Sequence, residues 1–235
     1  HWSLLDNYEW GNWEPTFGCE LEERLGNMGD GGKWVCNPSN LVGGGRQRML
    51  VYSVGSRNDF GFEQAVHDYF GEENVEIHTF DPGEPQGVPP FVAYHRMFLG
   101  DVDLPAESRY ALPTVMTALG HDDRTINVLK VDVEGSEHAV FHALANRPHV
   151  RARVDQILVE VHLSPRAWPE MTPALVNAML TMLTRDWGFE IFHKEPNTEF
   201  GGGVACEFSL VRVPWEGICG GASKAADVGA AQGAT

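Results

Sequence analysis

The chain has 235 residues, which is enough for one sizeable α/β domain or one domain with appendages. Hydrophobic residues make up 43% of it and aromatic residues 10%, so the chain can build a packed core. The formal net charge is −16, from 33 acidic against 17 basic residues, which argues against nucleic acid or an anionic membrane as a partner. No apolar run approaches the roughly 20 residues that a membrane-spanning helix needs.

The cysteines and the sequence ends leave the compartment open. The four cysteines lie far apart and form no CxxC pair, which argues against a structural zinc site built on thiolates. Cys19 and Cys36 are the most plausible local disulfide pair if the compartment is oxidising. No signal peptide or N-glycosylation motif is evident, but the chain begins at His1 rather than Met. The secretory or Golgi lumen and the cytoplasm both remain open, as does the oligomeric state.

The first part of the chain differs from the rest. Residues 1–47 show no regular period, and we interpret them as an N-terminal arm or lid with a tight functional loop at residues 30–34 (DGGKW). The β-branched, apolar residues 49–54 then predict a buried strand. Apolar positions at helical spacing follow in residues 62–70, and Gly71 is typical of a helix end. A strand–helix alternation therefore begins directly after the arm.

This alternation continues to the end of the core. Further strands are predicted at residues 75–80, 91–99, 126–131, 154–161, 187–192 and 208–213, and further helices at 113–119, 140–144 and 172–183. Such a pattern predicts an α/β fold with a mostly parallel sheet of seven strands, ending in an antiparallel hairpin. We expect one domain at residues 48–213. The Gly/Ala/Ser-rich residues 214–235 are expected to form a disordered tail.

Polar residues follow the first three strands of this predicted sheet, where ligands of α/β folds bind. Gly55 would let the backbone approach a ligand, and the next helix would offer free N–H groups. Asp81 stands where a carboxylate often accepts from a ribose diol, and Asp101 could accept from an adenine amino group. Ordinary turns are the alternative at each position. The candidates for nucleotide binding are Gly55, Ser56, Asn58, Asp59, Asp81 and Asp101.

The next two strands bring acidic residues together. The fourth strand carries Asp132 and Glu134, and the fifth carries Glu160 and His162, each pair at i, i+2 and so on one side of its strand. Acidic groups are costly to bury without a purpose, so we predict a catalytic cluster. His162 would accept a proton, oriented by Glu160 or Glu134. Asp132, Glu160 and His162 could instead bind Mg²⁺ or Ca²⁺.

Six segments share their order and spacing with a known family. They are residues 30–36 (DGGKWVC), 51–59 (VYSVGSRND), 77–82 (IHTFDP), 129–137 (LKVDVEGSE), 159–163 (VEVHL) and 193–197 (HKEPN). Together they resemble the FkbM-like methyltransferases, and the first and last are similar to the branch called methyltransferase domain family 22. The resemblance covers roughly residues 18–213. It implies a class I methyltransferase fold, Rossmann-like, with S-adenosyl-L-methionine as methyl donor.

The resemblance also implies roles for single residues. Gly55 would lie against the cofactor, Asp81 would hold the ribose, and Asp132 would lie beside the methyl-transfer region. Lys33 and Trp34, on the predicted lid, are further candidates for cofactor contact. Relatives suggest a hydroxyl of a sugar, glycan or small molecule as acceptor, and so an O-methylation.

Two other classes of protein compete with this interpretation. An NAD-dependent oxidoreductase shares the sheet type, but no G-x-G-x-x-G follows the first strand. A non-catalytic binding protein on the same fold is favoured by the sparse glycines after Gly55. The retained set of Asp132, Glu134, Glu160 and His162 argues against it.

Overall fold

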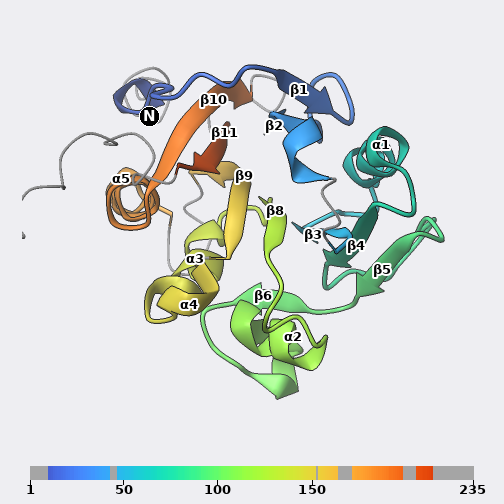
Figure 1. Cartoon of the computed structure of the whole chain (residues 1–235). Helices are drawn as coiled ribbons and strands as arrows, with labels where there is room; N and C mark the ends of the chain where they lie inside the picture. The colour runs from blue at the N-terminus through green and yellow to red at the C-terminus, as the bar shows by residue number, and fades with distance from the viewer. Residues whose placement is uncertain (1–9, 43–46, 152, 164–170, 198–204, 214–235) are drawn as a thin grey trace, which may run out of the picture.

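The computed structural model describes residues 10–42, 47–151, 153–163, 171–197 and 205–213 (Figure 1). The strands are β1 (Glu22–Leu25), β2 (Lys33–Cys36), β3 (Met49–Val54), β4 (Val75–Phe80), β5 (Val92–His95), β6 (Phe98–Gly100), β7 (Arg109–Ala111), β8 (Ile126–Val131), β9 (Val154–His162), β10 (Phe189–Asn197) and β11 (Ala205–Arg212). The α-helices are α1 (Gly61–Phe70), α2 (Leu112–Ala118), α3 (Glu137–Ala145), α4 (Pro148–Arg151) and α5 (Pro173–Thr181). Short 3-10 turns lie at Trp10–Asn12, Pro38–Leu41 and Pro105–Glu107, and a π-turn at Met182–Asp186 extends α5. The tail predicted at residues 214–235 and Cys219 lie outside the described residues.

Seven strands form the central sheet, in the order β10-β11-β9-β8-β3-β4-β5. Strand β11 is antiparallel to both of its neighbours, and the remaining pairs are parallel. The chain order changes direction between β3 and β8, where the connections leave toward opposite sides and open a crevice at the carboxyl ends. The predicted class I arrangement, a mostly parallel sheet with a C-terminal antiparallel hairpin, is confirmed.

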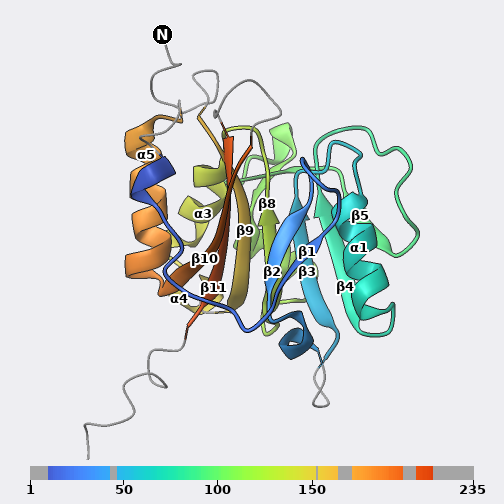
Figure 2. The same ribbon diagram turned by 90° about the horizontal axis from the view of Figure 1, so that it is seen from above.

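Layers of apolar residues cover both faces of the sheet, which explains why its central strands are mostly apolar. On β3, Leu50 and Tyr52 belong to the apolar layer under α2, α3 and α5, whereas Met49 and Val51 belong to the opposite layer under α1. Figures 1 and 2 show α1 and the β1–β2 hairpin on this second face. None of the helices within the described ranges has the length and apolar character of a membrane span.

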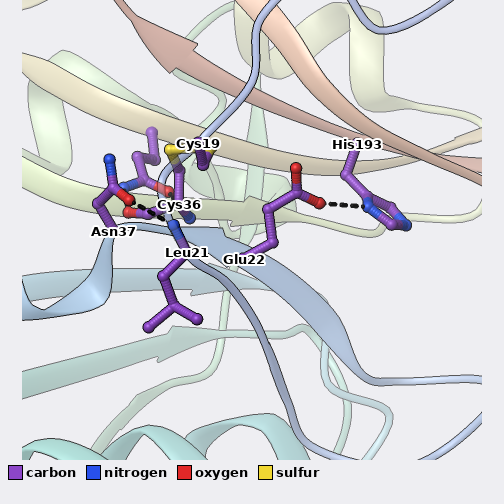
Figure 3. The surroundings of a disulfide bond; sticks show 7 residues. Cys19, Leu21, Glu22, Cys36, Asn37 and His193 are labelled. Carbon is purple, nitrogen blue, oxygen red and sulfur yellow. Dashed lines mark hydrogen bonds and ion pairs between the residues drawn. A yellow bond between two sulfur atoms is a disulfide. The ribbon is translucent and has the colours of Figure 1, made fainter.

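The N-terminal segment contains regular structure, which corrects the expectation of an aperiodic arm. Strands β1 and β2 pair as a hairpin, and Leu25 and Val35 are buried in the layer under α1. Gln156 of β9 binds the backbone of Cys36 twice, accepting from its N–H (2.9 Å) and donating to its oxygen (2.7 Å). The predicted disulfide of Cys19 with Cys36 joins the end of β2 to the chain entering β1 (Figure 3). Strands of four residues are too short to give a readable period.

Two strand boundaries differ from the prediction, and two residues that were assigned to a strand lie beyond its end. The strand expected at residues 91–99 divides into β5 and β6, and β6 pairs with β7 in a separate small sheet. Strand β10 continues to Asn197, so residues 193–197 are part of the hairpin strand and not of its connection. Strand β8 ends at Val131, which places Asp132 and Glu134 in the turn before α3. That turn, not a shared strand face, sets their directions.

Candidate active site

A cavity of about 450 Å³ opens at the carboxyl ends of β3, β4, β8 and β9. Its size is within the usual range for a small-molecule site. The predicted residues that line it are Gly55, Ser56, Asp59, Asp81, Asp132, Glu134, Glu160 and His162. Four other candidates, Lys33, Trp34, Asn58 and Asp101, are not among its lining residues. Most of the predicted site residues therefore border one cavity, and the four others lie outside its lining.

The turn after β3 requires glycine. Gly55 has φ +84°, and a Cβ at this position would lie 1.7 Å from the backbone oxygen of Asp132. Lys130, buried on β8, donates to the Gly55 oxygen at 2.5 Å. The ends of β3 and β8 thus meet backbone to backbone, and Gly55 leaves a backbone surface free of side chain at the cavity.

Asp81 organises this turn. Its Oδ2 accepts from the backbone N–H groups of Ser56 and Arg57, both at 2.8 Å, and its Oδ1 accepts from the N–H of Gly83 at 2.7 Å. Burial alone would raise the pKa of Asp81, but these backbone donors lower it below its ordinary value. The carboxylate is therefore ionised at neutral pH, and Oδ1 keeps a second lone pair for a ligand.

Asn58 and Asp59, further along the turn after β3, bind the surrounding loops. Asn58, at φ +61°, donates from Nδ2 to the backbone oxygen of Glu84 and accepts at Oδ1 from the N–H of Gln86. Asp59 accepts from the N–H of Gly61 at 2.9 Å at the start of α1 and from Asn27 at 3.1 Å. Asn58 therefore holds the loop after β4, while Asp59 connects α1 to the β1–β2 turn.

His162 is oriented by a residue that the sequence prediction missed. Its Nδ1 donates to Oε1 of Glu137 at 2.9 Å, and Glu137, the first residue of α3, is fully buried. Its Nε2 lies 3.8 Å from Glu134 and 3.9 Å from Glu160, beyond hydrogen-bonding distance. The predicted orienting role of Glu160 or Glu134 is corrected, because Glu137 makes the close contact. The arrangement is a carboxylate–imidazole pair on the wall of the cavity.

The charges around His162 favour its protonated form. Burial alone would lower its pKa, but the hydrogen bond that it donates to Glu137 and the nearby charges of Glu137, Glu160 and Asp132 raise it to about 9. At neutral pH the ring is an imidazolium, and it becomes a strong base once that proton leaves.

Lys33 lies beneath the cavity and neutralises several carboxylates. Its side chain is 1% exposed, with Nζ paired to Glu207, 3.4 Å from Asp132 and 3.7 Å from Glu160. Glu207 faces Glu160 across the β9–β11 register. Burial raises the pKa of Glu160, and the charge of Asp132 raises it further. Burial would also raise the pKa of Asp132, but the charges of Lys130 and Lys33 outweigh burial and lower it. Lys33 therefore holds the acidic cluster together rather than facing a cofactor.

Trp34 and Asp101 also lie elsewhere. The Trp34 ring stacks on His193 with centroids 4.3 Å apart, and its Nε1 donates to Glu195 at 3.0 Å. His193 in turn contacts Glu22 of β1 (Figure 3). Asp101 is exposed beyond β6. Of residues 193–197, only Asn197 lines the cavity, where it donates to Glu160 at 2.8 Å.

Comparison with known proteins identifies the class. A family model described as a methyltransferase domain matches residues 3–212, so the chain belongs to this methyltransferase domain family. A search of curated proteins found no match. The chain is accordingly a methyltransferase enzyme, and S-adenosylmethionine is its cofactor. The residues present fit that group, because the glycine turn at Gly55 and the ionised Asp81 border one cavity at the strand-order change.

Solved structures of similar fold are distant. A putative ribosomal RNA methyltransferase from Plasmodium falciparum is 9% identical over 71% of this chain and 87% of its own, with a TM-score of 0.45. An rRNA methylase from Streptococcus thermophilus is 9% identical over 75% and 92%, with a TM-score of 0.44. Magnesium protoporphyrin IX methyltransferase from Synechocystis PCC 6803, solved with bound SAM, is 9% identical over 71% of each chain, with a TM-score of 0.41. The assignment rests on the family match and not on these structures.

Proposed function

We propose that this enzyme methylates a hydroxyl group of a sugar, glycan or small molecule, with His162 as general base and Glu137 as its positioning residue. The observation that carries the proposal is the pair itself. Nδ1 of His162 is held by a buried carboxylate at 2.9 Å, so Nε2, on the cavity side, is the atom that accepts a proton once the imidazolium has lost its own. A hydroxyl must lose its proton when it attacks, and a base within reach supplies that step.

The cofactor half of the cavity would be formed by the ends of β3, β4 and β8. S-adenosylmethionine, when bound, supplies an electrophilic methyl group on a sulfonium. We propose that the backbone at Gly55 contacts it, that Asp81 accepts from its ribose hydroxyls, and that the carboxylate of Asp132 attracts its cationic end. Asp30 and Gly31 of the β1–β2 turn also line the cavity, so the lid function is proposed for this turn alone.

The acidic surroundings support a small neutral acceptor. The acceptor side carries Glu134 and Glu160, and the whole chain has a net charge of −16. A phosphate backbone would be repelled there, so we propose that nucleic acid is not the acceptor.

Glu134, at φ +57°, holds a left-handed conformation that non-glycine residues rarely adopt, and such strain is often found at functional sites.

Metal-assisted O-methylation is a second candidate. One ligand atom from each of Asp132, Glu160 and His162 lies within 4.8 Å of the others, which is close enough to hold a divalent cation. Lys33 argues against it, because its ammonium already lies 3.4 Å from Asp132 and 3.7 Å from Glu160. If EDTA abolishes turnover and Mg²⁺ or Ca²⁺ restores it, the metal mechanism is correct.

The experiment that tests the proposal identifies the methylated atom. The protein is incubated with S-adenosylmethionine carrying a trideuterated methyl group and with separate pools of glycans, metabolites and RNA. Mass spectrometry should find a deuterated O-methyl group in the glycan or metabolite pool, and far less of it with His162→Asn. Methylated RNA, or an N- or C-methyl product, would overturn the proposed acceptor. Unchanged product formation by His162→Asn would overturn the proposed base.

A further inference from the structure

A second polar cluster lies apart from the cavity, on the face of the sheet that α2 covers. Glu76 and His78 are two residues apart on β4, so both point to this face, where His78 is the neighbour of Tyr52 on β3. His121 approaches from the connection between α2 and β8. His78 and His121 are 7% and 5% exposed, so this is an unusually polar group for a buried position. The methyl-transfer mechanism makes no use of it.

We propose that Glu76, His78 and His121 form a zinc site. Three atoms converge there, since Oε1 of Glu76 is 2.9 Å from Nε2 of His78 and 3.3 Å from Nε2 of His121, and all three lie within 4.8 Å of one another. Ligand atoms around a tetrahedral zinc at its usual bond lengths are separated by roughly 3.3 Å. Two imidazole nitrogens and one carboxylate are ligands that suit zinc, with water in the fourth position.

The opposite nitrogen of each histidine has a partner. Nδ1 of His78 is 2.9 Å from Nε2 of His95, and Nδ1 of His121 is 2.7 Å from the hydroxyl of Tyr52. Metal-binding histidines almost always have such outer partners, which fix the ring and its tautomer. The partners leave both Nε2 atoms directed at Glu76. Its other oxygen, Oε2, accepts from Arg124 at 2.6 Å, so only Oε1 is turned toward the imidazoles.

The three side chains come from two parts of the fold, namely β4 and the connection between α2 and β8. Zinc would join the connection before β8 to β4 and so stabilise this half of the sheet.

The test is zinc binding by the whole protein after chelator treatment and dialysis, measured by Zn²⁺ titration and elemental analysis. His121→Asn keeps a polar atom near the position of Nδ1, toward Tyr52, and removes Nε2. We expect it to abolish binding at this site, and Tyr52→Phe to weaken binding by roughly 10–100-fold. His142→Asn, an exposed position on α3, and His162→Asn, in the cavity, are the matched controls and should bind Zn²⁺ as the unaltered chain does.

A measurement on the unaltered chain covers the case in which a variant fails to fold. Paramagnetic Co²⁺ should broaden the ring signals of His78 and His121 before those of His162, and Zn²⁺ should displace it. The proposal is overturned if the unaltered chain binds no Zn²⁺ or if a folded His121→Asn variant binds it equally well. It is also overturned if Co²⁺ broadens His162 and spares His121. None of these outcomes depends on methyl transfer.

Discussion

Two buried parts of the same sheet shift the pKa values of their histidines in opposite directions. In the cavity, carboxylates surround His162 and raise its pKa to about 9, although burial alone would lower it. On the α2 face, burial lowers the pKa of His95 to about 4, and the neighbouring rings of His78 and His121 add to the effect. Burial acts in the same direction in both places, so the neighbouring charges decide the outcome. The first cluster is suited to proton transfer, and the second, where two histidines and one carboxylate converge, is suited to binding a cation.

The largest expected effect comes from removing the cation at the centre of the acidic cluster. Lys33→Met leaves Glu207 and Glu160 buried without their counter-charge, so the free energy of unfolding should fall by about 3–5 kcal/mol. Urea denaturation measures the change. The double variant Lys33→Met/Glu207→Gln removes one of the orphaned charges and should recover part of the loss. Equal stability of Lys33→Met and the unaltered chain would show that the cluster does not depend on this ammonium.

The next effect concerns the base. His162→Asn should lower kcat by roughly 10²–10⁴-fold, because the acceptor then loses its proton without assistance. Cofactor affinity, measured by calorimetry with S-adenosylmethionine, should not fall, because the variant removes a cation that repels the sulfonium. His142→Asn, on the exposed side of α3, is the control for histidine substitution in general. A His162→Asn variant that keeps full kcat and has no metal dependence would exclude both proposed mechanisms.

A smaller effect, on the affinity for S-adenosylmethionine, is expected from a change at Asp81. Asp81→Asn keeps the shape of the side chain but removes the charge and one acceptor from the Ser56 and Arg57 N–H groups. Binding of S-adenosylmethionine should weaken by about 1–3 kcal/mol. Asp101→Asn, exposed and away from the cavity, is the matched control and should leave the affinity unchanged. Equal affinities for the two variants would reject the placement of the ribose at Asp81.

The sequence predicted the sheet and the cavity because both follow from local patterns. Parallel strands place their carboxyl ends at one edge, so Gly55, Asp81 and Glu160 could be assigned to a common site from strand ends alone. Glu137 is the last residue of the segment at residues 129–137 that resembles the family. Its contact with His162 depends on how α3 packs against β9, and the hydrophobic pattern of the sequence does not predict that packing.

Other contacts depend on long-range packing. Glu207 meets Glu160 only in the β9–β11 register, which the sequence does not specify. Lys33 reaches the cluster because β2 lies over β9, where Gln156 holds the backbone of Cys36. Strand β2 has only four residues, so its sequence shows no period from which the position of Lys33 could be predicted.

The central claim is that His162, held by Glu137, is a high-pKa base that faces the bound methyl donor. The most direct measurement is an NMR pH titration of the His162 ring in three states of the protein: free, with S-adenosylhomocysteine and with S-adenosylmethionine. We expect a pKa of about 9 in the free protein. S-adenosylmethionine, which alone carries the sulfonium charge, should lower this pKa relative to S-adenosylhomocysteine, because two nearby cations repel. Glu137→Gln should lower it in all three states. A pKa near the ordinary histidine value, or the same pKa with both ligands, would contradict the account.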